Sequence, residues 1–396
     1  MMRSILPILI SFTFVTVFSM TARSFLRRTN NKIWHSDILD TMAIGLPYLS
    51  AAFFLAFGLA IRLEWSFLLP VAATGLSILL ILSLIMVLTL PVSMLIRKIM
   101  LWRHTKKQEK KSKPLDENRR RFLKTAAAAL PVISIATTSN GFAGAFQKIR
   151  IPEIVFTFKN LPKDLDGFRI LHLSDMHLGY YFNLAELENL LQDVEHKSFD
   201  MVAITGDVAD DLSQLGQALT LIDQLKTSHP KFVSIGNHEY FRGIREVRRQ
   251  MEAGPVELLL NEHRVLRIRD TDLVIAGADD PIRMRADISG FLDNTVEKAL
   301  QGAPYESFKL LLSHRPGALD VAEKHQVDLI LAGHTHGGQM GINNRSLFEN
   351  IVKEPYLWGK YNKGRSQLYT SSGVGHWFPF RLGCPAEAPL ITLKRA

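Results

Sequence analysis

Five short apolar runs, each followed at once by Asp, His or Asn, constrain the fold of this chain more than any other feature. The runs are rich in Val, Ile and Leu, and amphipathic segments separate them, which is typical of buried strands that alternate with helices. Because ligand sites of open α/β sheets lie at the carboxyl ends of strands, we expect the polar clusters to meet at one edge. The runs span residues 168–174, 201–205, 231–235, 308–313 and 327–332.

These runs lie in the region 148–396, which we predict to be one α/β domain, because roughly 250 residues can bury a full hydrophobic core. The single cysteine, Cys384, excludes any disulfide within the chain. Predicted helices span 186–196, 212–226, 244–253 and 318–325, and a hairpin is predicted from 265–268 and 273–276.

The polar clusters have the composition of a site for two metal ions. Asp175 and His177 are separated by one residue, so on an extended segment both side chains lie on one face, and His334 and His336 repeat that spacing. A dinuclear hydrolytic site needs ligands for two cations about 3.5–4 Å apart, with one ligand shared. Carboxylates can bridge cations, and neutral imidazoles suit Mn, Fe or Zn. The further candidates are Asp207, Asn237 and His314.

The order of these motifs, D-x-H, G-D-x-x-D, G-N-H-E, H and G-H-x-H, resembles the calcineurin-like metallophosphoesterase family over about residues 151–396. Within that family the chain is similar to the membrane-attached phosphodiesterases that carry a twin-arginine export signal. The resemblance implies a four-layer α/β/β/α sandwich, in which helices cover two mixed β-sheets. It also implies two divalent metal ions per domain, with Mn ahead of Zn or Fe.

The resemblance assigns a role to each candidate residue. It places Asp207 as the bridge between the two metals and His238 as the general acid that protonates the leaving oxygen. Asp210 would orient His238, and Asp211 is the alternative for that role. The remaining ligands are Asp175, His177 and His336 for one metal, and Asn237, His314 and His334 for the other.

The first third of the chain contains long uncharged stretches at 4–22, 41–61 and 66–96. A membrane-spanning helix needs about 20 apolar residues, so we expect three transmembrane helices within 1–96. The segment 97–124 has 12 basic and 3 acidic residues, and such an excess is typical of a cytoplasmic loop. Alternation then places the catalytic domain on the outer side of a bacterial inner membrane, in a multi-pass protein.

A twin-arginine-like string, R-R-R-F-L-K, ends the basic segment at residues 119–124. The following stretch, 125–147, is either a fourth transmembrane helix or an export signal that ends in a small-residue cleavage site at Ala145. The twin-arginine translocase is therefore an expected partner, together with the membrane. Both interpretations place the domain after it on the same side.

The expected reaction is hydrolysis of a phosphodiester or pyrophosphate bond in a phosphorylated small molecule or an envelope lipid. The alternatives are a phosphomonoesterase and a non-catalytic membrane sensor or scaffold on the same fold. Residues 125–396 carry a net charge of −3, so no nucleic-acid partner is expected. The sequence does not indicate an oligomeric state. One predicted helix carries Arg242, Arg245, Arg248 and Arg249, which form either a solvated face or a grip on a second phosphate.

Overall fold

The computed structural model divides the chain into two compact units, Met1–Phe142 and Ala143–Ala396. The second unit contains all the predicted site residues. The structure describes residues 37–63, 71–79, 135–179, 181–281, 287–376 and 378–396, together with isolated positions at 13, 15–17, 20, 65, 68, 81, 95 and 133.

The first unit corrects one prediction. Across the described residues, no helix combines the length and the apolar character that a bilayer crossing requires. The expected N-terminal transmembrane helices, and with them the multi-pass inner-membrane localisation, are therefore wrong. The predicted span 41–61 falls in α2 (Asp37–Arg62), which contains Pro47.

Several other N-terminal predictions concern residues of which little or nothing is described. The basic segment 97–124 and its motif at 119–124 lie outside the described residues, as do most of the stretches 4–22 and 66–96. Residues 135–145 form a helix, and Ala145 is buried at its end.

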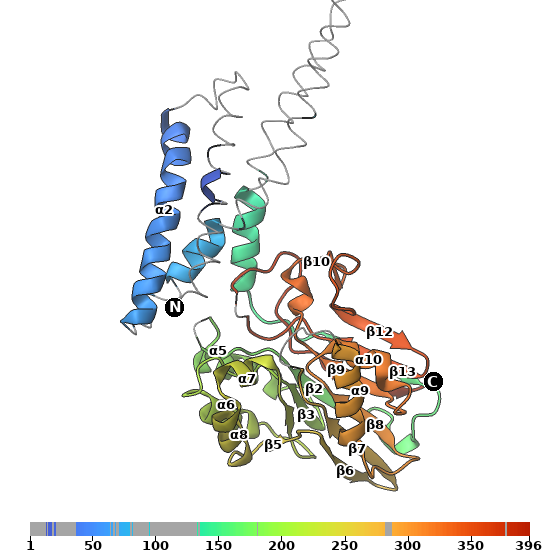
Figure 1. Ribbon diagram of the computed structural model, residues 1–396. Coiled ribbons are helices and arrows are strands. Elements are labelled where there is room, and N and C mark those ends of the chain that lie inside the picture. The colour runs from blue at the N-terminus through green and yellow to red at the C-terminus, as the bar shows by residue number, and fades with distance from the viewer. Residues whose placement is uncertain are drawn as a thin grey trace, which may run out of the picture. The chain divides into compact units, whose positions relative to one another are not determined.

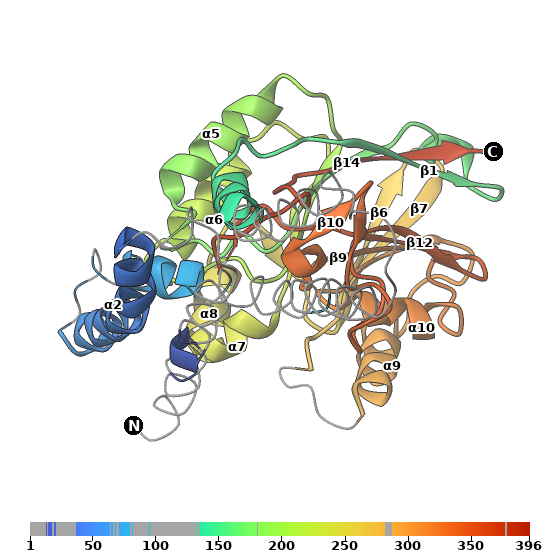
Figure 2. The ribbon, with the colours of Figure 1, turned by 90° about the horizontal axis from the view of Figure 1, so that it is seen from above.

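Two six-stranded sheets form the second unit (Figures 1 and 2). The first has the order β1-β14-β2-β3-β4-β5, in which β14 runs antiparallel to β2 and the other neighbours are parallel. Its strands are β1 (Glu153–Phe158), β2 (Arg169–Leu173), β3 (Met201–Thr205), β4 (Phe232–Ser234), β5 (Glu257–Leu258) and β14 (Leu390–Arg395). The last strand of the chain therefore lies inside this sheet.

The second sheet has the order β12-β13-β9-β8-β7-β6 and is parallel except for its two outer pairs. Its strands are β6 (Glu262–Ile268), β7 (Thr271–Gly277), β8 (Phe308–Leu312), β9 (Leu329–Ala332), β12 (Gly359–Lys363) and β13 (Ser366–Thr370). A short hairpin of β10 (Gly341–Ile342) and β11 (Arg345–Ser346) follows β9. The mixed α/β fold is thus confirmed.

Alternation along the strands explains the layers. In β2, Ile170 faces a core shared by the two sheets, whereas Leu171 and Leu173 face the core beneath the helices. Helices α5, α6 and α8 cover the first sheet, and α9 and α10 cover the second (Figure 1). These helices span α5 (Leu184–Glu195), α6 (Leu215–Asp223), α8 (Ile244–Glu252), α9 (Ile288–Ala299) and α10 (Leu319–Ala322).

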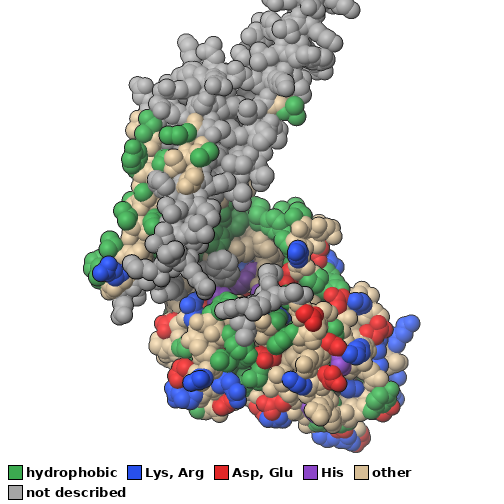
Figure 3. Space-filling model, in the orientation of Figure 1, with side chains coloured by type: hydrophobic (Ala, Val, Ile, Leu, Met, Phe, Trp, Pro, Cys, Tyr) green, Lys and Arg blue, Asp and Glu red, His purple; other side chains and the backbone are tan. Residues whose placement is uncertain are grey.

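Local sequence signals set several helix boundaries. The Asn183 side chain accepts hydrogen bonds from the first turn of α5, and Glu186 bonds back to the Asn183 N–H, which forms a capping box. Helix α10 ends three residues before the predicted end, because the chain turns after Ala322, where the His325 N–H donates to the Ala322 carbonyl oxygen. Acidic and basic side chains are interspersed over the face of this unit in Figure 3, as expected for a domain of low net charge.

Candidate metal centre

The loops that leave the strands bring the predicted ligands together in an unusual backbone conformation. Asp175, His177, Asp207, His334 and His336 all have positive φ angles, between 48° and 72°. Non-glycine residues rarely adopt this left-handed region, and where they do the surrounding structure must hold them there. Strained conformations cluster at functional sites, so this concentration marks the edge as the candidate site.

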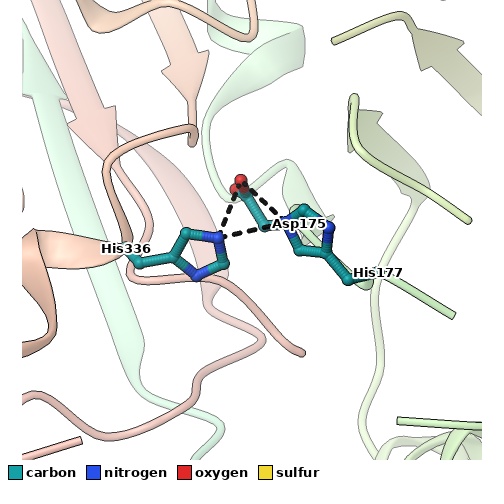
Figure 4. Close-up of side chains that lie close together, drawn as sticks. All are labelled: Asp175, His177 and His336. Atoms are coloured by element: carbon teal, nitrogen blue, oxygen red, sulfur yellow. Dashed lines mark hydrogen bonds and ion pairs between the residues drawn. The ribbon is translucent and has the colours of Figure 1, made fainter. Parts of the chain in front are cut away.

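The first group of ligands joins β2 to the loop after β9. His336 Nε2 lies 3.1 Å from His177 Nε2 and 3.5 Å from Asp175 Oδ1. Figure 4 shows these three side chains pointing toward one another. His177 Nε2 lies 4.0 Å from the same Asp175 oxygen. All three side chains are buried. Their atoms converge on one point, so the group could hold a metal ion.

The second group joins β3, β8 and β9. His334 Nδ1 lies 3.3 Å from His314 Nε2, and His314 Nδ1 contacts the Thr205 carbonyl oxygen at 2.8 Å. Asp207 lies between the two groups, because its Oδ2 is 3.2 Å from His314 Nε2 and 3.6 Å from His177 Nε2. A single carboxylate therefore contacts both sets of imidazoles.

Asn237 provides an independent test of whether a metal fits here. It begins the short helix α7 (Asn237–Arg242) after β4, and its side chain is buried. Its Oδ1 has no hydrogen-bond partner among the described residues. A buried amide oxygen without a partner is costly in a folded protein, and coordination of a cation would satisfy it. The donor set therefore fits a metal ion.

His238 and Asp210 form a pair beside the ligands. His238 Nδ1 lies 2.6 Å from Asp210 Oδ1, and Asp210 Oδ2 lies 3.3 Å from His177 Nδ1. The rings of His238 and His177 are 4.5 Å apart. Asp211 instead accepts hydrogen bonds from Ser213 and Gln214 in its own turn. Of the two carboxylates, only Asp210 contacts His238.

Burial and neighbouring charges raise the pKa of one imidazole of the site and lower the pKa of two others. Although burial disfavours a charged ring, Asp207 raises the pKa of His314 to about 10. Burial holds the pKa of His334 well below its usual range, and Arg315 adds to this effect. Burial, with His177 nearby, does the same for the pKa of His336. Burial opposes ionisation of Asp207, but His314 outweighs it and keeps the pKa of that carboxyl well below its usual range.

Comparison with known proteins identifies the family of this chain. A family model for calcineurin-like phosphoesterases matches residues 168–338. An uncharacterized metallophosphoesterase from Aquifex aeolicus is 30% identical over 254 residues, which cover 62% of this chain and 92% of that protein. The chain belongs to the calcineurin-like phosphoesterase family. Its Asp and His groups could hold the divalent metals that this family uses.

Two further relatives of this calcineurin-like phosphoesterase are also named as uncharacterized metallophosphoesterases. The protein from Helicobacter pylori strain J99 is 31% identical over 260 residues, which cover 64% of this chain and 66% of that protein. YkuE from Bacillus subtilis is 29% identical over 290 residues, which cover 70% of this chain and 98% of that protein. The chain thus spans slightly less than two thirds of the Helicobacter pylori relative.

The structure of the phosphoesterase adds supporting residues that the sequence analysis did not single out. The Glu239 carboxylate accepts hydrogen bonds from the backbone N–H groups of Asp207, Val208 and Gly236, at 2.7 to 2.9 Å. It therefore ties the loops after β3 and β4 together. Its place in the G-N-H-E motif was a signal that could have found it.

Two buried arginines contact imidazoles of the candidate site. Arg315 donates to Asp280 at 2.8 Å and contacts His334 Nε2. Arg381 donates to the carbonyl oxygens of Ser372, Gly373 and Gly375 and lies 3.4 Å from His336 Nδ1. Arg315 directly follows the ligand His314, which was a weak sequence signal. No local pattern points to Arg381, because it acts from a distant loop.

Proposed function

We propose that this protein hydrolyses phosphodiester or pyrophosphate bonds with a water molecule activated between two divalent metal ions. The position of Asp207 carries the proposal, because this carboxylate contacts His177 from one group and His314 from the other. A ligand shared between two cations is the central requirement of a dinuclear hydrolytic site. We propose Mn as the metal, with Zn or Fe as alternatives, since the donors are imidazoles and hard oxygens.

Each metal would have three ligands of its own in addition to Asp207. When bound, the two ions would lower the pKa of a water molecule and neutralise charge on the phosphoryl oxygens. The proposed ligands are Asp175, His177 and His336 for one ion, and Asn237, His314 and His334 for the other.

The remaining chemistry is the protonation of the leaving oxygen, which we assign to His238. Asp210 holds His238 Nδ1 at 2.6 Å, so Nε2 is the nitrogen left to serve the substrate. The carboxylate at Nδ1 also orients the ring, which must give its proton to the leaving group and then recover one. Asp210 thereby acts on the reaction through His238.

Turnover of two chromogenic substrates tests this proposal. The purified full-length chain with added Mn²⁺ should hydrolyse bis(p-nitrophenyl) phosphate, lose that activity in EDTA and regain it when Mn²⁺ is restored. Asp210→Asn should lower turnover, whereas the matched Asp211→Asn should not, because Asp211 bonds within its own turn. Hydrolysis of p-nitrophenyl phosphate, with no cleavage of bis(p-nitrophenyl) phosphate or of diadenosine 5′,5′-pyrophosphate, would contradict the proposal in favour of a phosphomonoesterase. Hydrolysis of none of these three substrates by metal-loaded protein would contradict catalysis itself.

A further inference from the structure

Arg242 differs from two neighbouring arginines of the α7–α8 segment. Arg248 and Arg249 lie on α8 and form ion pairs with Glu252 at 2.7 Å and with Glu246 at 2.5 Å. Each of these pairs lies within one exposed helix, so both belong to a solvated face. Arg242 instead contacts Asp210 in the candidate site, with its Nη2 at 3.1 Å and its Nε at 3.2 Å from Oδ1.

This contact places the Arg242 guanidinium beside the proposed general acid. Asp210 Oδ1, which Arg242 contacts, is also the oxygen that lies 2.6 Å from His238 Nδ1. The Arg242 side chain is 42% exposed, so part of it remains open to a ligand. A guanidinium has five N–H donors and can bind a second anion while it keeps its first. Helix α7 ends at Arg242 because Gly243 adopts φ 112°, and α8 then starts in a new direction.

An apolar ring completes this side of His238. Phe241 is 58% exposed, and its ring lies 5.5 Å from the His238 ring. Exposed aromatic rings next to a charged donor suit a ligand that has both an anionic and an organic part. The two residues that end α7 therefore offer one cationic and one apolar contact, side by side at the general acid.

We propose that Arg242 binds the second phosphate of a pyrophosphate substrate, on the leaving-group side of the bond that breaks. This inference rests on the proposed function and narrows its substrate class. Arg242 contacts Asp210, the partner of the proposed general acid, and we place the leaving group beside the exposed part of its guanidinium. A guanidinium there stabilises a leaving phosphate through charge-assisted hydrogen bonds, and an alcohol leaving group offers it no anion. The organic substituent of that phosphate contacts Phe241.

The reaction adds one water molecule across the P–O–P linkage. The water oxygen bonds to the phosphorus held at the ligand cluster, and the bond from that phosphorus to the bridging oxygen breaks. The bridging oxygen leaves with the electron pair and takes the proton from His238, and a proton of the water restores His238. The products are two phosphomonoesters, and no oxidant or reductant is needed.

Two probes that differ by one phosphate test this inference. They are diadenosine 5′,5′-pyrophosphate and diadenosine 5′,5′-monophosphate, measured with the full-length chain and Mn²⁺. We expect Arg242→Gln to raise the KM for the pyrophosphate by about 10- to 100-fold, the value of one charged hydrogen-bonding contact. The KM for the monophosphate should stay within about threefold, and Arg242→Lys should restore part of the loss. Arg249→Gln is the matched control and should leave both constants unchanged.

The other outcomes distinguish a failure of the Arg242 inference from a failure of the proposed hydrolytic function. If Arg242→Gln lowers kcat equally on both probes, Arg242 acts only through Asp210 and the inference is overturned. It is also overturned if the wild type cleaves bis(p-nitrophenyl) phosphate and the monophosphate but not the pyrophosphate. If the metal-loaded wild type cleaves none of these substrates, the proposed function itself fails.

Discussion

The two sheets contribute different chemistry to one edge. Among the predicted site residues, the first sheet provides every carboxylate and the amide, together with His177 and His238, whereas the second sheet provides only imidazoles. The loops of the first sheet are also tied to one another by the buried Glu239. We infer that the first sheet provides the negative charge of the site. That charge then changes the pKa values of the imidazoles on the second sheet. His314 shows this response, because Asp207 raises its pKa.

Asp207→Asn is the most direct test of whether the first sheet provides the charge that acts on the second. The change removes the one carboxylate that contacts both His177 and His314, so both metal positions lose a ligand. We expect turnover to fall by more than about 10⁴-fold, beyond the usual loss for a single proton-transfer group. Turnover of bis(p-nitrophenyl) phosphate and metal content by mass spectrometry check this. Retention of two metals per chain would show that Asp207 does not bridge them.

His238→Ala tests a residue of the first sheet that should not be a ligand. Its ring is held by Asp210 and lies beside the ligand group, so we expect the metals to stay while turnover falls by about 10²- to 10⁴-fold. Metal content and single-turnover rates measured on the same preparation separate the two effects. Loss of a metal would reassign His238 as a ligand, an arrangement that its closeness to His177 and Asp207 would allow.

Local sequence patterns predicted the elements that carry this edge better than those far from it. The run 201–205 coincides with β3, and the Asp175 and Asp207 clusters lie together because β2 and β3 are parallel neighbours in one sheet, whereas the His334 cluster comes from the second sheet. The place of β14 between β1 and β2 could not be predicted, since that pairing joins the two ends of the domain.

The remaining errors have identifiable physical causes. The contact of Arg242 with Asp210 depends on how α7 ends, which its sequence spacing does not reveal. Uncharged stretches predicted transmembrane helices from their length alone, but no helix of the described residues has both the length and the apolar character that a bilayer crossing requires. Short-range pattern thus identified the candidate ligands, whereas the residues that contact them from other loops needed the folded structure.

Glu239→Gln tests whether the loops of the first sheet depend on this buried carboxylate. Its effect should be smaller than that of the two preceding variants. The glutamine keeps the shape but loses the charge, and one of its two head-group atoms becomes a donor that faces backbone N–H groups. We expect metal affinity to fall by about 10- to 100-fold, the usual cost of disturbing the support of a ligand. The free energy of unfolding should fall by about 1–3 kcal/mol. Equilibrium dialysis and urea unfolding measure these changes, and unchanged metal affinity would contradict the support role.

Proton release on metal binding is the smallest effect and tests how the second sheet responds to the first. The pKa of His314 is raised to about 10, so in the metal-free protein this ring carries a proton at pH 8. The pKa values of His334 and His336 are lowered, so these rings are already neutral. Binding needs a neutral imidazole, so His314 should release its proton when the metal binds.

The raised pKa of His314 also predicts how the stability of the metal-free protein should change with pH. The pKa of His314 in the folded state exceeds the ordinary value of 6.5, so its stabilisation is fully present below pH 6.5 and is lost as pH rises towards 10. The difference in unfolding free energy between the metal-free wild type and His314→Gln should shrink across that window.

Titration calorimetry at pH 8, in buffers of different ionisation enthalpy, counts the proton that is released when the metal binds. A count of zero would mean that Asp207 does not charge His314, and the two sheets would then act independently.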